Sequence, residues 1–381
     1  MRIKTLSFED KSRNWHFDSL SFNDKLTLLV GASGVGKTQI LNAIKKLKRI
    51  AKGESFNGLK WSVVFETIDE EEYVWSGEFG SRNEIQLDDI ASEKKDKYAF
   101  LQEKLWKEDN LLIDRSPETI FFNGNQIVKL PSEQSVVALL KEEPVVSPVF
   151  DGFAKIGELV FNTKSVSLTI LGKSLLEPLL LHFKSVDEIR HSGLGTEIKL
   201  CLLYYTDKNE FKKIQSRFIN IFPQVEQIKV EVVPGISSDA IGDYPVIQLK
   251  EKGVKDWILQ PMISSGMLKS LLQVAELYLC EDGAVILIDE FENSLGVNCM
   301  DELTEDLVAS ERDVQFIITS HHPYIINNIP YRNWKIVTRK AGTVVVKNAS
   351  DYKIGQSKHD AFIQLLQLLL QVRWLNSQIT E

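Results

Sequence analysis

An α/β fold built around a mixed sheet is the fold class that the sequence predicts, and three observations support it. Apolar segments of strand length alternate with segments of helical periodicity, most clearly between residues 264 and 319. The short apolar segment at residues 26–30 runs into a glycine-rich turn and an amphipathic helix. In residues 1–22, apolar and polar side chains alternate, which predicts antiparallel strands beside the parallel ones.

Composition narrows the class of protein. The 381 residues are 43% hydrophobic and 26% charged, which is typical of a globular chain and excludes a disordered or fibrous one. No apolar run could span a bilayer and residues 1–11 lack a secretory signal, so we expect a cytoplasmic protein without a membrane partner. The net charge of −8 argues against nucleic-acid binding over the whole surface but allows a local basic patch. The widely spaced Cys201, Cys280 and Cys299 predict reduced, buried thiols.

The first part of the chain is expected to form strands interrupted by helices. Residues 1–22 predict a β-hairpin that caps one edge of the sheet. Residues 37–52 predict a helix, because Ile40, Leu41 and Ile44 recur on one face. Further strands are predicted at residues 61–66, 73–78 and 119–123, and helices at residues 88–109, 131–140 and 147–161.

The rest of the chain returns to the main sheet after an insertion. The pattern of residues 173–222 is helical, and an inserted helical arm is expected at residues 166–250, which also contain strands at 225–233 and 244–249. Helices follow at residues 264–279, 300–310 and 360–374, buried strands at 284–289 and 314–319, and a closing hairpin at 334–347. We therefore predict an N-terminal lobe at residues 1–165, the arm at 166–250 and a C-terminal lobe at 251–381.

The glycine-rich turn has the residues and the context of a phosphate-binding loop. It follows a strand, opens a helix and reads Gly31, Ala32, Ser33, Gly34, Val35, Gly36, Lys37, Thr38. Backbone N–H groups there can donate to phosphates, Lys37 adds positive charge at the outer ones, and Thr38 offers a hydroxyl to Mg²⁺. With the adjoining Gln39, these residues predict a site for ATP and Mg²⁺.

Two carboxylates follow a buried strand more than two hundred residues downstream. Asp289 and Glu290 would lie at the sheet edge where ligands bind, so Asp289 would hold Mg²⁺ and Glu290 would polarise the attacking water. Taken alone, such acids often only cap the next helix. Together with the phosphate loop they favour a hydrolytic site.

Two further features gain meaning from their order in the chain. His321 follows the next buried strand and could contact the γ-phosphate or the water, whereas His322 is the weaker candidate. Ser264, Ser265, Gly266 and Met267 open a helix whose N-terminus could bind phosphate, although serines there are mostly caps.

These motifs, with residues 293–295, resemble in order and spacing the ABC ATPase superfamily in its SMC-like and RecF-like branch. More closely, they resemble ATP-binding proteins related to the OLD-family ATPases of bacterial defence systems. Two sequence motifs usual in that family, Ile-Asp-Glu-x-Glu-Asn-x-Leu and Thr-x-His-x-Pro, occur here at residues 288–295 and 319–323. The resemblance covers about half of the chain and implies an ABC-type ATPase head.

The resemblance also implies a head-to-head homodimer, with room for a higher assembly. Ser265 and Gly266 would belong to the signature motif, which reaches the γ-phosphate held by the other subunit. Residues 293–295 would cross the interface, and His321 would be the switch histidine. The Q-loop glutamine, expected at the metal, would be Gln126 or Gln134, of which we prefer Gln134.

Departures from the family pattern shape the functional prediction. The signature lacks the usual acid or glutamine after Gly266, so slow or partner-dependent hydrolysis is expected. About sixty residues follow His321, too few for the Toprim nuclease domain of OLD proteins, and the arm lacks the sustained heptads of SMC coiled coils. By analogy with the family it resembles, we expect an ATP-dependent switch that controls a separate effector, a nuclease or toxin, in anti-phage defence, triggered by phage nucleic acid or protein.

Three alternatives remain open. One is a RecF-like ATPase that clamps DNA during repair, which would have a basic stripe on the surface of the dimer. The negative net charge of the chain counts mildly against this alternative. A transporter subunit is ranked last, because the Leu-Ser-Gly-Gly-Gln signature is absent. A pseudo-ATPase is disfavoured by the presence of Lys37, Asp289, Glu290 and His321.

Overall fold

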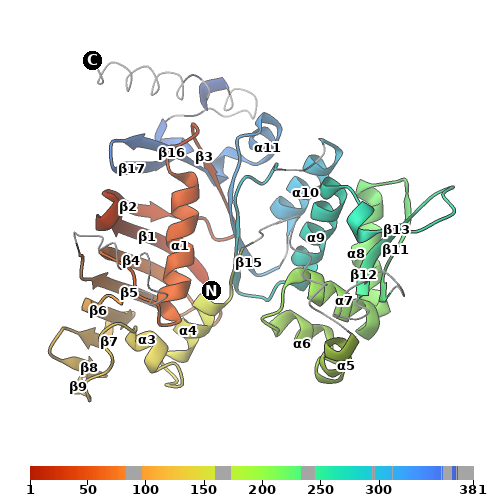
Figure 1. Ribbon diagram of the computed structural model, residues 1–381. Coiled ribbons are helices and arrows are strands. Elements are labelled where there is room, and N and C mark those ends of the chain that lie inside the picture. Colours follow the sequence, from red (N-terminus) through yellow and green to blue (C-terminus); the bar gives the residue numbers. More distant parts are fainter. Residues whose placement is uncertain are drawn as a thin grey trace. The chain divides into compact units, whose positions relative to one another are not determined.

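The computed structural model describes residues 1–82, 97–158, 173–232, 245–293, 295, 297–310, 312–352, 354, 363–365 and 367. The chain divides into two compact units, each built from separate parts of the sequence (Figure 1). Unit 1 comprises Met1–Glu158, Asp282–Phe291 and Glu311–Glu381, and unit 2 comprises Leu159–Glu281 and Glu292–Ser310. Across the described residues, no helix has the length and apolarity that a membrane span needs.

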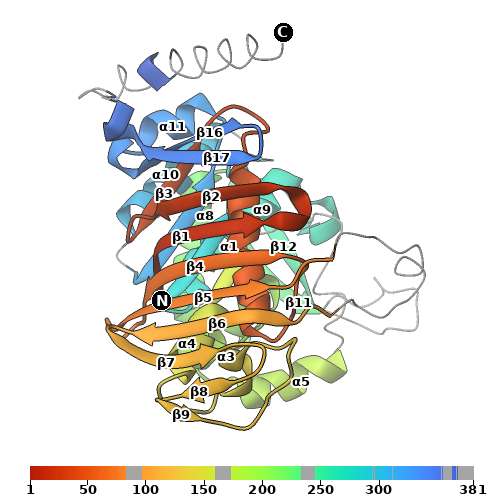
Figure 2. The ribbon, with the colours of Figure 1, turned by 90° about the vertical axis from the view of Figure 1, so that its left-hand side faces the viewer.

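Unit 1 is organised by one mixed sheet, which has fourteen strands among the described residues in the order β10-β14-β15-β3-β16-β17-β2-β1-β4-β5-β6-β7-β8-β9. The strands are β1 (Arg2–Asp10), β2 (Trp15–Ser21), β3 (Leu26–Val30), β4 (Leu59–Glu66), β5 (Glu72–Phe79), β6 (Phe100–Lys107), β7 (Asn110–Arg115), β8 (Ile120–Phe122), β9 (Asn125–Gln126), β10 (Ile156–Glu158), β14 (Ala284–Ile288), β15 (Val314–Thr319), β16 (Trp334–Lys340) and β17 (Thr343–Asn348). Figure 2 shows the run from β17 to β9.

The sheet has a parallel part and an antiparallel part. Strands β10, β14, β15, β3 and β16 are parallel to one another, and every residue of β3, β14 and β15 is buried, as expected of strands covered on both faces. Strands β2, β1 and β4 to β9 are antiparallel to one another, and β17 joins the two parts, because it is antiparallel to β16 and parallel to β2. The predicted α/β fold with a mixed sheet is confirmed.

The N-terminal hairpin lies inside the sheet, so its predicted place at an edge was wrong. Strand β1 pairs with β2 on one side and with β4 on the other, from Arg2 opposite Glu66 to Asp10 opposite Leu59. Alternation alone shows that a strand has one buried face, but it does not show how many neighbours the strand has.

Three helix predictions also need correction. Residues 100–107, inside the helix predicted at 88–109, form strand β6, because they pair with β5 along their length. The helix predicted at 147–161 ends early, as α4 (Ser147–Ala154), and β10 follows it. In the predicted helix 131–140, only α3 (Val136–Leu139) is helical, with Ser135 as its cap. Most of the predicted helix 360–374 lies outside the described residues.

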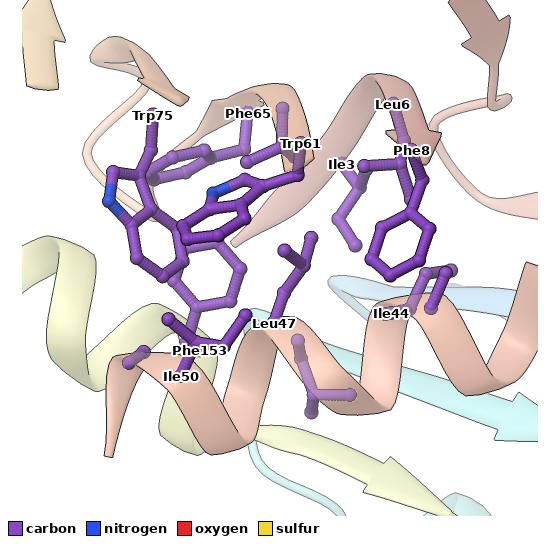
Figure 3. Packing of buried hydrophobic residues seen from close by; sticks show 14 of the residues in the cluster. Ile3, Leu6, Phe8, Ile44, Leu47, Ile50, Trp61, Phe65, Trp75 and Phe153 are labelled. Atoms are coloured by element: carbon purple, nitrogen blue, oxygen red, sulfur yellow. The ribbon is translucent and has the colours of Figure 1, made fainter. Parts of the chain in front are cut away.

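The core of unit 1 lies between the antiparallel strands and α1 (Lys37–Ala51) (Figure 3). Three of the helix residues in this core, Ile44, Leu47 and Ile50, are fully buried. They belong to one cluster with aromatic and aliphatic side chains from β1, β4, β5 and α4, namely Ile3, Leu6, Phe8, Trp61, Phe65, Trp75 and Phe153. This burial fixes the helix, and therefore its first turn, against the sheet.

Unit 2 combines helices with a small antiparallel sheet. Its elements are α5 (Lys173–His182), α6 (Val186–His191), α7 (Thr196–Thr206), α8 (Lys208–Ile221), β11 (Val225–Val232), β12 (Pro245–Glu251), β13 (Ile258–Leu259), α9 (Ser265–Leu279) and α10 (Val297–Ala309). Helices α7 and α8 both pack on α9. Unit 2 therefore includes α9 and α10 in addition to the segment 166–250.

Short elements complete unit 1. They are the 3₁₀ turns at Lys11–Arg13, Tyr331–Asn333 and Ala349–Tyr352 and helix α11 (Pro323–Asn328). Asp10 caps the first of these turns and His322 caps α11 with its ring, since Nδ1 accepts from the Tyr324 N–H at 3.3 Å. His322 therefore has a structural role, in line with its lower ranking as a site residue.

Candidate nucleotide-binding site

The phosphate loop of unit 1 connects β3 to α1. Gly34 and Gly36 have positive φ values of 81° and 110°, which side chains rarely adopt. A Cβ atom at position 36 would also lie 2.9 Å from Cγ2 of Val344, and one at position 31 would lie 2.3 Å from the carbonyl oxygen of Val337. The β16–β17 hairpin thus forms a wall behind the loop, and glycine is required at both positions.

The side chain of Lys37 folds back onto this loop. Its Nζ donates to the carbonyl oxygens of Gly31 and Ala32, at 2.9 Å each, and only 5% of the residue is exposed. The buried ammonium adds its charge to the donors at the start of α1, so this end of the helix favours an anion. Val35 packs against the core of unit 1 and anchors the loop.

Asp289 and Glu290 lie beside the start of α1, at the carboxyl end of β14. Asp289 Oδ1 accepts from the hydroxyl of Thr38 at 3.2 Å and from the hydroxyl of Thr319 at 2.7 Å. The Thr319 hydroxyl in turn accepts from the backbone N–H of Glu290 at 2.8 Å, and the Phe291 N–H donates to the Thr319 carbonyl at 3.0 Å. The ends of β14 and β15 are thereby tied together.

Glu290 has an uncommon backbone conformation. Its φ of +48° is in the left-handed region, which costs a non-glycine residue about 1–2 kcal/mol. The two hydrogen bonds to Thr319 hold this turn in place. The consequence is that the Glu290 side chain is exposed and lines the pocket, instead of continuing the buried strand.

A pocket of about 300 Å³ brings these residues together. Its lining from the phosphate loop and α1 comprises Ser33, Gly34, Gly36, Lys37, Thr38 and Gln39, and its lining from other strands comprises Asp289, Glu290, Thr319, His321 and Arg339. Gly31 and Ala32 contribute their carbonyl oxygens to Lys37. The predicted residues of the phosphate loop, the two acids and His321 therefore lie at one site.

The donor set of this pocket fits Mg²⁺. The Thr38 hydroxyl and the Asp289 carboxylate are hard oxygen ligands 3.2 Å apart. Among the described residues, no group of three or more His, Cys, Asp and Glu side chains could hold a metal ion by itself. A metal here would thus take its other ligands from phosphate oxygens and water, which is how Mg²⁺ is usually bound.

Two residues of the pocket escaped the sequence analysis. Thr319 is the first residue of the Thr-x-His-x-Pro motif, but the motif itself does not indicate a role for the threonine hydroxyl. Arg339 lies in β16, where its Nη1 contacts Oε1 of Gln39 at 3.5 Å. Sequence alone offered no signal for Arg339, because only the pairing of β16 with β3 brings it to the phosphate loop.

The two candidate Q-loop glutamines lie elsewhere in unit 1. The Gln134 side chain lies beside Gly53, which follows the C-terminal end of α1. The 15 residues of α1 span about 22 Å, so Gln134 is that far from Thr38 and is excluded as a ligand of a metal bound there in this conformation. Gln126 belongs to β9, the last strand of the sheet.

The signature residues belong to unit 2. Ser264 caps α9 by accepting from the Met267 N–H at 3.3 Å, Ser265 is exposed in the first turn, and the Gly266 carbonyl accepts from Ser270 Oγ at 2.8 Å. Lys269, which is 5% exposed, donates to the carbonyl of Asn293 and links α9 to the loop after the acids. Ser294, in the middle of that loop, lies outside the described residues.

Comparison with known families gives one match. Residues 199–327, about a third of the chain, match the family described as "AAA domain, putative AbiEii toxin, Type IV TA system". The matched segment contains the two acids and His321 but not the phosphate loop. A comparison with curated proteins gave no match.

Several solved structures are similar at 15% sequence identity. One is the SmcHead bound to the C-winged helix domain of ScpA, with 91% of this chain and 97% of that chain covered and a TM-score of 0.48. A second is the SMC head domain from Thermotoga maritima, with coverages of 91% and 99% and a TM-score of 0.41. A third is the Smc head domain with an extended coiled coil bound to the C-terminal domain of ScpA derived from Pyrococcus furiosus, with coverages of 92% and 97% and a TM-score of 0.44.

Proposed function

We propose that the protein binds ATP with Mg²⁺ at the phosphate loop of unit 1 and hydrolyses it. The observation that carries the proposal is the hydrogen-bonded cluster of Thr38, Asp289 and Thr319 at the start of α1, beside Lys37 and Glu290. A donor-rich loop, a magnesium ligand pair and an exposed carboxylate are the parts that phosphoryl transfer to water needs. The AAA-domain description of residues 199–327 supports the same class of activity.

Each residue has a separate task in this mechanism. The loop N–H groups and Lys37 bind the β- and γ-phosphates and orient them. Bound Mg²⁺ would neutralise the developing charge on the phosphate oxygens, held through Thr38 and Asp289. Glu290 would orient the attacking water and accept its proton, and His321 would contact the γ-phosphate or that water.

We further propose that the active site is completed by a second copy of the chain. The start of α9 supports this, since Ser264 and Ser265 are exposed and the preceding Met262 has 76% of its surface exposed. An exposed helix N-terminus with small residues can bind an anion presented by another molecule. In a head-to-head homodimer, Ser265 and Gly266 of one copy would reach the γ-phosphate in the other.

The biological role we propose is an ATP-dependent switch that controls a separate effector in anti-phage defence. The description of the matched family, "AAA domain, putative AbiEii toxin, Type IV TA system", supports a two-component arrangement. Genes next to this one are the first candidates for the effector. Co-expression with each neighbour, with and without Glu290→Gln, tests whether the nucleotide state changes their association, and a neighbour bound equally in both states would contradict the switch.

ATP turnover and oligomeric mass test the enzymatic proposal. We expect the wild type to hydrolyse ATP with Mg²⁺, and Glu290→Gln to bind ATP, lose turnover and accumulate as a dimer. The matched control is Glu118→Gln, a carboxylate that is 86% exposed and outside the pocket, which should behave as the wild type. If nucleotide neither binds to the wild type nor alters its mass, the proposed function is wrong.

A further inference from the structure

Strand β16 contributes a cation to the pocket from the side opposite the acids. In the strand order β14-β15-β3-β16, the phosphate loop follows β3, the acids follow β14, and His321 follows β15. All four strands are parallel, so their carboxyl ends share one edge of the sheet. Arg339, near the carboxyl end of β16, therefore lies across the phosphate loop from Glu290.

This topology gives the pocket two chemically different ends. One end has the oxygen ligands and the exposed Glu290 carboxylate, where the transferred phosphoryl group must lie. The other end has Arg339 and Gln39, and no carboxylate among the lining residues comes from that side. A triphosphate that points its γ-phosphate toward Glu290 must turn its α-phosphate toward Arg339.

The surroundings of Arg339 hold the guanidinium at that end. Its Nε donates to the carbonyl of Ala341 at 2.8 Å, and its Nη1 contacts Oε1 of Gln39 at 3.5 Å. The first bond fixes the side chain on the turn of the hairpin, and the second directs the planar group toward the first turn of α1. A guanidinium positioned in this way suits a phosphate, because it donates through two parallel N–H groups.

We propose that Arg339 binds the α-phosphate of the nucleotide, with Gln39 as the residue that positions it. The inference rests on the proposed nucleotide site. It adds to that site a residue that contacts the nucleotide beyond its β- and γ-phosphates. ADP and ATP have the same α-phosphate, so Arg339 stabilises both to the same extent. It lowers the Michaelis constant and leaves turnover at saturation unchanged.

Calorimetric titration of Arg339→Gln with MgADP and MgATP tests the inference, using the Glu290→Gln background for ATP. We expect both affinities to fall about tenfold or more, with the ATP-to-ADP ratio preserved. Arg339→Lys should recover part of the loss, since it keeps the charge but not the planar donor pair. In the otherwise native enzyme, Arg339→Gln should raise the Michaelis constant with little change in kcat.

The controls separate this inference from the proposed function and from a purely structural role. Lys340→Gln removes the neighbouring exposed cation, which does not line the pocket, and should leave both affinities unchanged. If only ATP binding weakens, Arg339 contacts the γ-phosphate and the inference is wrong. If neither affinity changes, Arg339 only supports the hairpin turn. If the wild type binds no nucleotide, the proposed function itself fails.

Discussion

Thr319 Oγ1 lies 2.7 Å from Asp289 Oδ1 and links two strands at the floor of the pocket. The same oxygen accepts a hydrogen bond from the backbone N–H of Glu290, so a single hydroxyl both orients Asp289, the proposed metal ligand, and supports the strained turn after it. Thr319 therefore holds Asp289 and Glu290 in place, and it lies two positions before His321 at the end of β15.

Removing this hydroxyl should impair turnover more than binding. We expect Thr319→Val, which keeps the shape, to lower kcat about 10–100-fold, because hydrogen bonds to charged groups are worth about 1.5–3 kcal/mol. Thr319→Ser keeps the hydroxyl and should stay close to the wild type. Steady-state ATP hydrolysis measures both, and equal rates for the valine and serine variants would exclude the positioning role.

Mixing two inactive variants should restore activity if each site is shared between two copies. Lys37→Ala disables the phosphate loop and Ser265→Arg blocks the start of α9, so each variant alone should be inactive. A mixed dimer has one intact site, formed by the phosphate loop of one copy and the signature of the other. Because about half of randomly formed dimers are mixed and each has one of its two sites intact, mixing should recover about a quarter of the wild-type activity. Hydrolysis that stays at the sum of the separate variants after mixing would contradict a shared site.

The two strained glycines of the phosphate loop should differ in their tolerance of a methyl group. Gly34→Ala should cost about 1–2 kcal/mol of stability, because its φ is positive but no atom lies within 4 Å of the new Cβ. Gly36→Ala should cost a further ~1–3 kcal/mol through its clash with Val344 and should weaken MgADP binding. In thermal unfolding, the double variant Gly36→Ala/Val344→Ala should recover the part of the stability loss that comes from the clash with Val344. If it recovers none, the whole loss of stability comes from the backbone conformation at position 36.

A buried carboxylate in the antiparallel part of the sheet should dominate the stability of that part. Glu103 is fully buried and accepts from Trp75 Nε1 at 3.1 Å, from Ser135 Oγ and from the Val136 N–H at 2.8 Å, with Arg115 at 3.8 Å. We expect Glu103→Ala to lower the free energy of unfolding by about 3–5 kcal/mol, since it leaves the three buried donors Trp75 Nε1, Ser135 Oγ and the Val136 N–H without their acceptor. Glu103→Gln, which keeps one acceptor, should cost less.

The same residue gives a pH dependence with a defined sign. Burial raises the pKa of Glu103 above its ordinary value, so the folded state holds a proton that the unfolded state releases near pH 4. Stability should therefore fall as the pH rises from the ordinary pKa to the raised one. The advantage of the wild type over Glu103→Gln in denaturant unfolding should be largest at low pH, and a growing advantage at higher pH would contradict this assignment.

Local signals in the sequence predicted the part of the site that is itself local. The loop from Gly31 to Thr38 and the acids after β14 depend on neighbouring residues, so their spacing was enough to identify them. Arg339 and the central place of the N-terminal hairpin depend on which strands pair, and a strand's alternation does not encode its neighbours. Gln134 was misplaced for the same reason, since its position follows from the far end of α1 and not from its own motif.

The wall behind the phosphate loop has a consequence for the protein's synthesis. Gln39 and Arg339 are 300 positions apart, and the hairpin that confines Gly31 and Gly36 comes after β15 in the chain. A nascent chain on the ribosome thus carries the loop sequence long before it carries the strand that shapes it. Nucleotide capture should therefore become possible only after β16 and β17 have been translated, so products truncated before these strands should not compete with longer ones for ATP.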